Sequence, residues 1–99
     1  SCQPMIYYLL PRAEEDIEQI GDYLAERSPP AAARLVEAFH EKWLRLTHFP
    51  HLGIEREDIM PGIQHVVVAD YVALYRVTEE GIEIVRVFHG HRHITAGHL

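Results

Sequence analysis

The chain has little cysteine and no long apolar run, and each absence narrows what the protein can be. The single cysteine, Cys2, cannot form a disulfide within the chain, so nothing in the sequence asks for an oxidising compartment. No apolar run approaches the roughly 18 residues that span a bilayer. No signal peptide is visible at the N-terminus. We therefore expect a cytoplasmic protein without a membrane segment.

Positive charge is also scarce. Nine lysine and arginine residues stand against fifteen aspartates and glutamates, which gives a formal net charge of −6, and Lys42 is the only lysine. A net negative domain repels the phosphate backbone of nucleic acids, so binding to DNA or RNA would need a local concentration of basic residues. We expect protein partners and no direct, sequence-specific contact with nucleic acid.

The length and composition indicate one small folded domain. The chain has 99 residues, of which 47% are hydrophobic, enough for a single core of two layers. We expect this domain to cover residues 6–99. Residues 1–5 differ in character from the rest of the chain and are expected to form a leader, either a cloning remnant or a frayed terminus.

Two stretches with helical spacing come after a short apolar run. Ile6–Leu10 is expected to form a strand that Pro11 ends. Apolar residues recur every three or four positions from Arg12 to Arg27, and again from the Ser28-Pro29-Pro30 break to Phe49-Pro50. Ser28 or a proline suits the start of the second helix. Because the connection is so short, the two helices must be antiparallel neighbours.

The second half of the chain reads as strands. Residues 51–62 are expected to form a loop, Ile63–Ala69 a valine-rich central strand, and Asp70 the turn after it. Two more strands, 71–77 and 82–88, flank the break Thr78-Glu79-Glu80-Gly81. The order β-α-α-β-β-β predicts an α+β fold, with a helical hairpin packed on one face of a small, mainly antiparallel sheet.

The register of the last hairpin decides which of its faces enters the core. If Val77 pairs with Ile82, then Leu74 faces Val85 and Val72 faces Val87, which forms an aliphatic face suited to a core. The opposite face then carries Tyr71, Ala73, Tyr75, Ile84, Arg86 and Phe88. Such an aromatic face is either covered or contacts a partner. A slip of one residue would exchange the two faces.

Short motifs in a fixed order along the chain resemble the ParE branch of the RelE/ParE toxin superfamily. The first helix carries Asp16-Ile17-Glu18-Gln19-Ile20-Gly21-Asp22-Tyr23, where the family shows Asp-hydrophobic-hydrophobic-x-Ile-x-x-Tyr. Phe49 to Gly53 matches Phe-Pro-x-x-Gly, and Tyr75-Arg76-Val77 with Ile82 through Arg92 matches the closing signature. The resemblance covers roughly Tyr7 to Ile94. His91 and His93 stand where many relatives carry alanine and aspartate, which weakens any inference from that end.

The resemblance implies a toxin of a type II toxin–antitoxin system, of the kind that stabilises plasmids. Such a toxin is held inactive by a ParD-like antitoxin, and ParE-like members are implied to poison DNA gyrase by binding, without catalytic residues, cofactor or metal. The residues expected to contact the target are Tyr71, Tyr75, Arg86, Phe88 and Arg92. The residues expected to contact the antitoxin, which are also the simplest core residues, are Ile17, Ile20, Leu24, Leu35 and Phe39.

A RelE-like nuclease is the main alternative. RelE-like members cleave mRNA in the ribosomal A site, and an enzyme of this kind would use Arg86, His89, His91 and Arg92 here. Histidines can supply acid and base, and arginines can stabilise the phosphate. The acidic charge balance is unfavourable for docking on ribosomal RNA. A third alternative is a family member retained only as a complex partner and repressor component.

Several of these residues also have simpler explanations. Arg86 can stack on or pair with a partner, or its stem can pack across neighbouring aromatic rings. Arg76 falls opposite Glu83, which predicts a cross-strand ion pair. The spacing His89-x-His91-x-His93 resembles a zinc site, but Gly90 argues against a rigid extended geometry. We expect a polar tail there and no metal.

Overall fold

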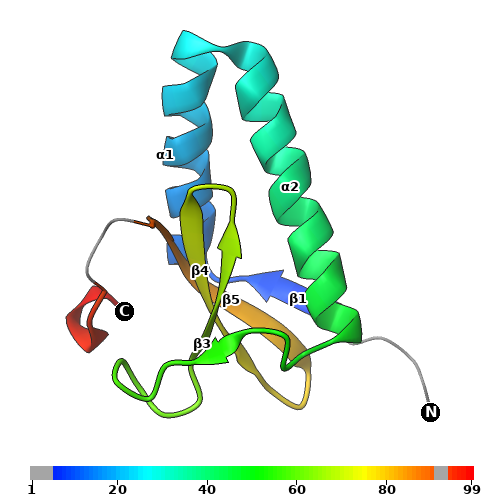
Figure 1. Ribbon diagram of the computed structural model, residues 1–99, viewed down its shortest axis with the longest axis vertical. Helices are drawn as coiled ribbons and strands as arrows, with labels where there is room; N and C mark the ends of the chain where they lie inside the picture. Colours follow the sequence, from blue (N-terminus) through cyan, green and yellow to red (C-terminus); the bar gives the residue numbers. More distant parts are fainter. Residues whose placement is uncertain (1–5, 91–93) are drawn as a thin grey trace.

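A helical hairpin and a five-stranded sheet make up the computed structural model, which describes residues 6–90 and 94–99 (Figure 1). The elements in chain order are β1 (Ile6–Leu9), α1 (Pro11–Arg27), α2 (Pro29–His48), β2 (Ile54–Glu55), β3 (Gln64–Val68), β4 (Tyr71–Val77), β5 (Gly81–His89) and a short 3-10 helix (Ala96–His98). The leader expected over residues 1–5 lies outside the described part of the chain. None of the helices described is long and apolar enough to cross a membrane.

The helical hairpin forms where the sequence predicts it. Ser28 is the N-cap of α2, and its hydroxyl accepts a hydrogen bond from the Ala31 N–H at 3.3 Å. Pro29 follows at the first helical position, where a missing N–H costs nothing. The same reason lets α1 begin at Pro11, one residue earlier than expected. The hairpin packs on one face of the sheet, and its tip projects beyond the ends of the strands (Figure 1).

The sheet has the strand order β1-β5-β4-β3-β2. Strand β1 pairs in parallel with β5, and the other neighbours are antiparallel. The α+β order is therefore as predicted, with one addition. The expected loop 51–62 contains β2, a strand of only two residues that pairs with His65 and Gln64 of β3.

A β-bulge in the last hairpin makes part of the predicted register wrong. Val77 does pair with Ile82, as expected, and Arg76 with Glu83. Between Tyr75 and Leu74 the register shifts, because Val85 is an extra residue on β5. Leu74 therefore lies opposite Arg86, where Val85 was predicted. Beyond this point every predicted pair is displaced by one, so Val72 faces Phe88 instead of Val87.

The face that packs under the helices carries Tyr71, Ala73, Tyr75 and Ile84, which the predicted register placed opposite the expected aliphatic core face. Tyr75 and Ile84 are 0% exposed and belong to the core between helices and sheet, together with Ala73. Of the two alternatives for this face, covered or in contact with a partner, the structure therefore supports the first, because the helices of the chain itself cover Tyr71 and Tyr75. The assignment of Leu74 to the core under the helices is wrong, since it lies on the other face with Phe88. Two helices cover this face, and a layer of that area needs large side chains to fill it at the density of a protein interior.

A second apolar cluster closes the other face of the sheet. Its members come from β4, β5, the loop before β3 and the C-terminal segment, and they are Ile59, Ile63, Leu74, Phe88 and Ile94. Because both faces are covered, β4 and β5 lie in the centre of the molecule. This arrangement leaves open surface along the strand edges and around the helical hairpin.

Candidate docking surfaces

Arg86, the residue singled out on the sheet, is tied to the first helix. Its Nε and one terminal nitrogen donate to the two carboxylate oxygens of Asp16 at 2.7 and 2.9 Å. Asp16 also accepts the Val87 N–H at 2.9 Å, two residues after the bulge. The hydrogen bonds that Arg86 donates to Asp16 raise the pKa of Arg86 above its ordinary value. With side chains only 12% and 14% exposed, this pair fastens α1 to β5.

Both simple explanations for the arginines have support in the structure. The Arg86 guanidinium lies 4.5 Å from the centre of the Phe88 ring, as expected for a stem packed across aromatic residues. Arg76 forms the predicted cross-strand ion pair with Glu83, with Nε and Oε1 2.6 Å apart. Asp16 was not predicted as the partner of Arg86, because the two residues are 70 positions apart in the chain.

Tyr75 holds a loop in place. Its hydroxyl accepts the Gly53 N–H at 2.9 Å and lies 2.8 Å from the Pro50 carbonyl and 3.0 Å from the Gln64 amide. Burial raises the pKa of Tyr75. Gly53 has no room for a side chain, because a Cβ would lie 2.6 Å from the Tyr75 hydroxyl. The Phe-Pro-x-x-Gly motif and the Tyr-Arg-Val motif thus meet in one hydrogen-bond network.

Of the other residues expected to contact the target, only Tyr71 is seen to be partly accessible in the described part of the chain. Tyr71 is half-buried, with its ring centre 6.0 Å from that of Phe39 and 5.4 Å from that of His89. Burial raises the pKa of Tyr71. Phe88 is buried in the outer cluster. His91, Arg92 and His93 lie outside the described residues, so the target and nuclease roles predicted for them stay predictions. In the part described, no group of three possible metal ligands comes together.

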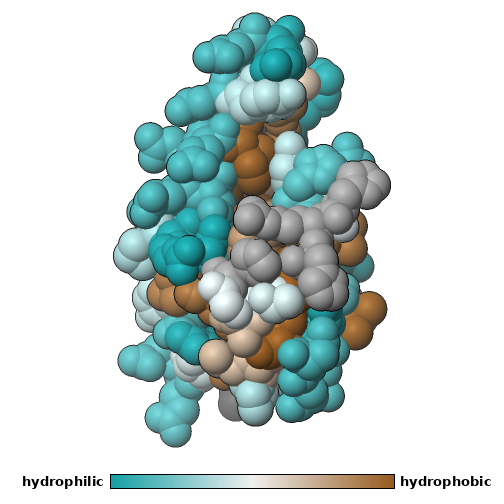
Figure 2. All heavy atoms as spheres, turned by 90° about the vertical axis from the view of Figure 1, so that its left-hand side faces the viewer, coloured by the Kyte–Doolittle hydropathy of each residue, from teal (hydrophilic) through white to brown (hydrophobic). Residues whose placement is uncertain are grey.

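A cleft separates the projecting helical hairpin from the ends of β4 and β5. We call it the helical cleft; it consists of two hollows of about 550 and 360 Å³. Its apolar and aromatic lining residues include Ile20, Tyr23, Leu24, Leu35 and Tyr71. Figure 2 shows apolar side chains at its floor between hydrophilic rims. Of the predicted antitoxin contacts, Ile20, Leu24 and Leu35 lie here, whereas Ile17 and Phe39 face a smaller pocket beside β1.

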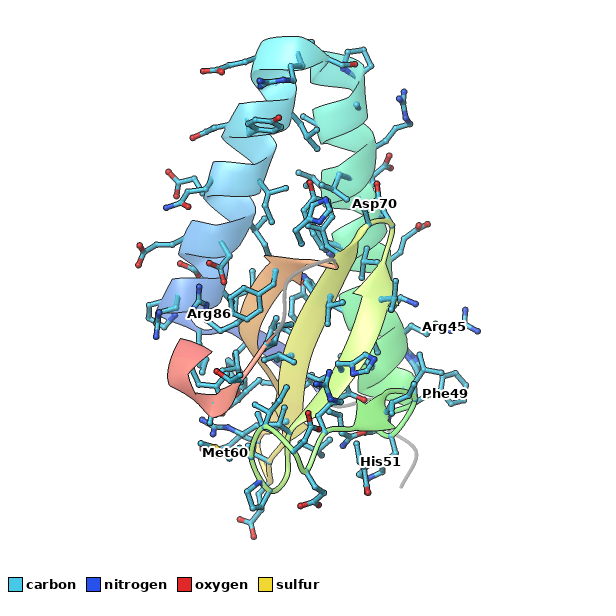
Figure 3. All side chains as sticks on the ribbon, turned by 60° about the vertical axis from the view of Figure 1, so that its left-hand side comes forward. Arg45, Phe49, His51, Met60, Asp70 and Arg86 are labelled. Atoms are coloured by element: carbon cyan, nitrogen blue, oxygen red, sulfur yellow. The ribbon has the colours of Figure 1, made fainter. Side chains whose placement is uncertain are left out.

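A second open surface runs along the other side of the molecule. We call it the edge groove; it lies between the C-terminal half of α2 and the outer edge of β3, in two adjoining hollows of about 700 and 390 Å³. Both hollows are lined by Lys42, Arg45 and Val67. Arg45, Phe49 and His51 point outward on this side (Figure 3). The sequence did not single out these lining residues for binding, although apolar and cationic residues are interspersed from Lys42 to Phe49.

The fold is shared with chains of two solved toxin–antitoxin structures. The structure resembles the chromosomal ParDE toxin–antitoxin system from P. aeruginosa, with a TM-score of 0.73 and 23% identity over 86% of this chain and 95% of that one. It also resembles the toxin–antitoxin complex RelBE2 from Mycobacterium tuberculosis, with a TM-score of 0.58 and 22% identity over 88% and 99% of the two chains. The fold is therefore that of the RelE/ParE superfamily.

Within this superfamily, the chain belongs to the ParE toxins of type II toxin–antitoxin systems. The model of that family, described as the ParE toxin of parDE, matches residues 7–94. Toxin ParE3 of Caulobacter vibrioides is 35% identical over 63 residues, which are 64% of this chain and 59% of ParE3. Putative toxin Y4kP of Sinorhizobium fredii is 31% identical over 83 residues, 82% of this chain and 83% of that protein. The match thus spans under two thirds of ParE3 but most of Y4kP.

Proposed function

We propose that this chain is a growth-inhibiting toxin that acts by binding DNA gyrase and is neutralised by a ParD-like antitoxin. Membership of the ParE family supports this assignment. The structural observation that carries it is the form of the open surface. The helical cleft and the edge groove are both open hollows with apolar residues in their lining and a size suited to protein segments, while the sheet itself is covered on both faces.

Binding without catalysis also fits the state of the candidate catalytic residues. Ribonucleolytic cleavage needs an acid, a base and free cations beside the phosphate. Arg86 directs its charge at Asp16, and His89 packs edge-on against Tyr71. The net charge of −6 further disfavours docking on ribosomal RNA. The gyrase proposal therefore stands ahead of the RelE-type nuclease.

The first experiment separates the two activities in cells and in vitro. The chain is induced alone in bacteria, and DNA and protein synthesis are followed by pulse labelling. We expect early arrest of DNA synthesis with filamentation, and loss of supercoiling or trapped cleavage complexes when purified protein is added to gyrase. Unchanged gyrase activity at micromolar protein would refute the proposal. Early arrest of translation with cut transcripts would favour the nuclease instead.

The helical cleft is the proposed seat of an antitoxin helix. Its apolar floor between two helices suits the apolar stripe of an amphipathic helix. Tyr23 lines the cleft and is 56% exposed, so replacing it removes contact area without opening the core. We expect Tyr23→Ala to weaken antitoxin binding about tenfold or more. The matched control is Tyr8→Ala, since Tyr8 is 41% exposed on β1, away from the cleft. Equal affinities of the two variants would argue against this seat.

A further inference from the structure

The edge groove exists because β2 is only two residues long and begins at Ile54. If β2 began one residue earlier, Gly53 would lie opposite Val66 in the antiparallel register. Instead the Gly53 N–H is held by the Tyr75 hydroxyl, and Leu52 turns back to bond to the Phe49 carbonyl. The strand position beside β3 is therefore filled for two residues and empty for the rest.

The unfilled part of the β3 edge presents backbone groups that a strand can bind. Val68 and Tyr71 flank the two-residue connection Ala69–Asp70, and such a connection closes on a hydrogen-bonded pair. Bonded pairs alternate along an antiparallel ladder, so Val67 directs its N–H and C=O away from β4, toward the groove. Among the described residues, no backbone bond outside the ladder reaches residues 66–69. Such an edge is a template for another strand.

The wall of the groove selects the charge of the occupant. Lys42 and Arg45 line it from α2, and neither forms an ion pair with any residue that the structure describes, whereas Arg56, Arg76 and Arg86 all do. Glu41 is the one carboxylate of α2 in this lining. Two such cations in a chain of net charge −6 favour an acidic segment at this place. A second copy of this chain would instead bring the two cationic walls toward each other.

The groove also has an apolar component. Val67 is 57% exposed on the outer side of β3, and Phe49 is 60% exposed at the end of α2. Leu44, on the same stretch of α2, is exposed as well. Successive residues of a strand point to opposite faces. An added strand could therefore direct carboxylates to Lys42 and Arg45 and apolar side chains to Val67.

We propose that an extended acidic segment of the antitoxin adds to the sheet here, as a strand in line with β2 and opposite residues 66–69. This inference rests on the proposed function, because it takes the antitoxin as partner. It goes further by placing a second antitoxin segment at the edge groove, separate from the helical cleft. The main-chain bonds give affinity, and the two cations give charge selectivity.

Hydrogen exchange tests the strand directly. The purified chain is compared alone and with the antitoxin encoded beside it, and exchange is read at the Val67 amide. We expect exchange at Val67 to slow about tenfold or more in the complex, because its N–H gains a bonded partner. The turn at residues 78–81 serves as the internal control. A complex that protects the helical cleft and leaves Val67 unchanged would overturn the proposal.

Charge reversal tests the cationic wall. We expect Arg45→Glu to raise the Kd for the antitoxin about tenfold or more. Arg12→Glu is the matched control, since it makes the same charge change on an exposed arginine at the start of α1, away from both the helical cleft and the edge groove. Thermal unfolding of both variants confirms that they fold. Lysine substitutions at antitoxin carboxylates should restore binding to Arg45→Glu. Equal Kd values for the two variants would overturn the proposal.

The two proposals fail in different ways. A chain that leaves growth and gyrase unaffected, but binds the antitoxin with protection at Val67, would refute the toxin activity and keep the strand site. A toxic chain that the antitoxin neutralises equally well after Arg45→Glu, with no protection at Val67, would keep the toxin activity and refute the strand site. Binding of a single-stranded RNA oligonucleotide in the groove, without protection by the antitoxin, would also refute the strand site.

Discussion

Single residues in this protein hold together segments that are far apart in the chain. The Tyr75 hydroxyl joins β4 to the loop after α2, and the Asp16 carboxylate joins α1 to β5. Both groups satisfy backbone N–H donors as well as side chains. Removing either one therefore leaves several polar atoms without a partner in a place that water reaches poorly.

Replacement of Tyr75 by phenylalanine isolates the hydroxyl. Tyr75→Phe leaves the Gly53 N–H, the Pro50 carbonyl and the Gln64 amide without their bond to it. We expect the free energy of unfolding to fall by about 1–3 kcal/mol, measured by urea denaturation. Tyr8→Phe is the control, because Tyr8 is exposed on β1. Equal denaturation midpoints for the two variants would show that the network contributes nothing.

Replacement of Asp16 by asparagine tests the pair with Arg86. Asp16→Asn removes the carboxylate that pairs with the largely buried Arg86 charge, so we expect a loss of about 3 kcal/mol in the free energy of unfolding. Glu83→Gln breaks the more exposed Arg76 pair and should cost far less. Urea is used as the denaturant because guanidinium chloride, a salt, would screen the charges of both ion pairs. Similar losses in both variants would mean that burial of the Asp16 pair does not matter.

At the scale of the elements, the stretch from β2 to β3 combines a short strand with a charged cluster. Arg56 donates to both carboxylate oxygens of Asp58 and lies 3.3 Å from His65 Nδ1. Burial, and then the neighbouring Arg56 charge, lower the pKa of His65, while Asp58 acts in the other direction. His65 also lines one hollow of the edge groove, together with Lys42 and Arg45 of α2.

This histidine should make the stability depend on pH. The pKa of His65 in the folded chain lies below the ordinary value of 6.5, so the unfolded chain binds the proton first as pH falls. The free energy of unfolding should therefore decrease as pH drops below about 6.5. His65→Gln should reduce this decrease. Urea denaturation of both proteins at pH 7.5 and pH 5.5, taken here as about one unit either side of 6.5, makes the comparison. A variant with the full wild-type slope would contradict the assignment.

On the scale of the whole molecule, the sheet is buried on both faces by unlike partners. The helical hairpin covers one face, while a loop and the C-terminal segment cover the other. The molecule is thin for its length, with extents of 42 × 32 × 20 Å, because the hairpin projects past the sheet. This shape is what leaves the helical cleft open.

The C-terminal segment should therefore contribute to stability. Ile94 is buried against the outer face, so we expect Ile94→Ala to lower the free energy of unfolding by about 2 kcal/mol. Val67→Ala is the control, because Val67 lies on the same side of the sheet but is exposed. Urea denaturation compares the two. An Ile94 variant as stable as the Val67 variant would show that the outer cluster is not cooperative with the rest of the fold.

Local signals in the chain were sufficient for the order of elements. Ser28 and the prolines mark the helix boundary, apolar spacing marks the two helices, and the Val77–Ile82 pair marks the last turn. Each of these signals depends on residues within a few positions of one another. The family could be inferred from the same residues, because its motifs are short and lie in a fixed order.

The tertiary structure decided which face of the sheet is the core and which surfaces remain open. The bulge at Val85 shifts the strand pairs beyond it by one, and no local propensity specifies that shift. Tyr75 and Arg86 looked like contact residues because their partners, Gly53 and Asp16, are distant in sequence. The edge groove likewise depends on the residue at which β2 begins. The periodicity of the sequence alone does not predict these contacts, since they form only when separate elements pack together.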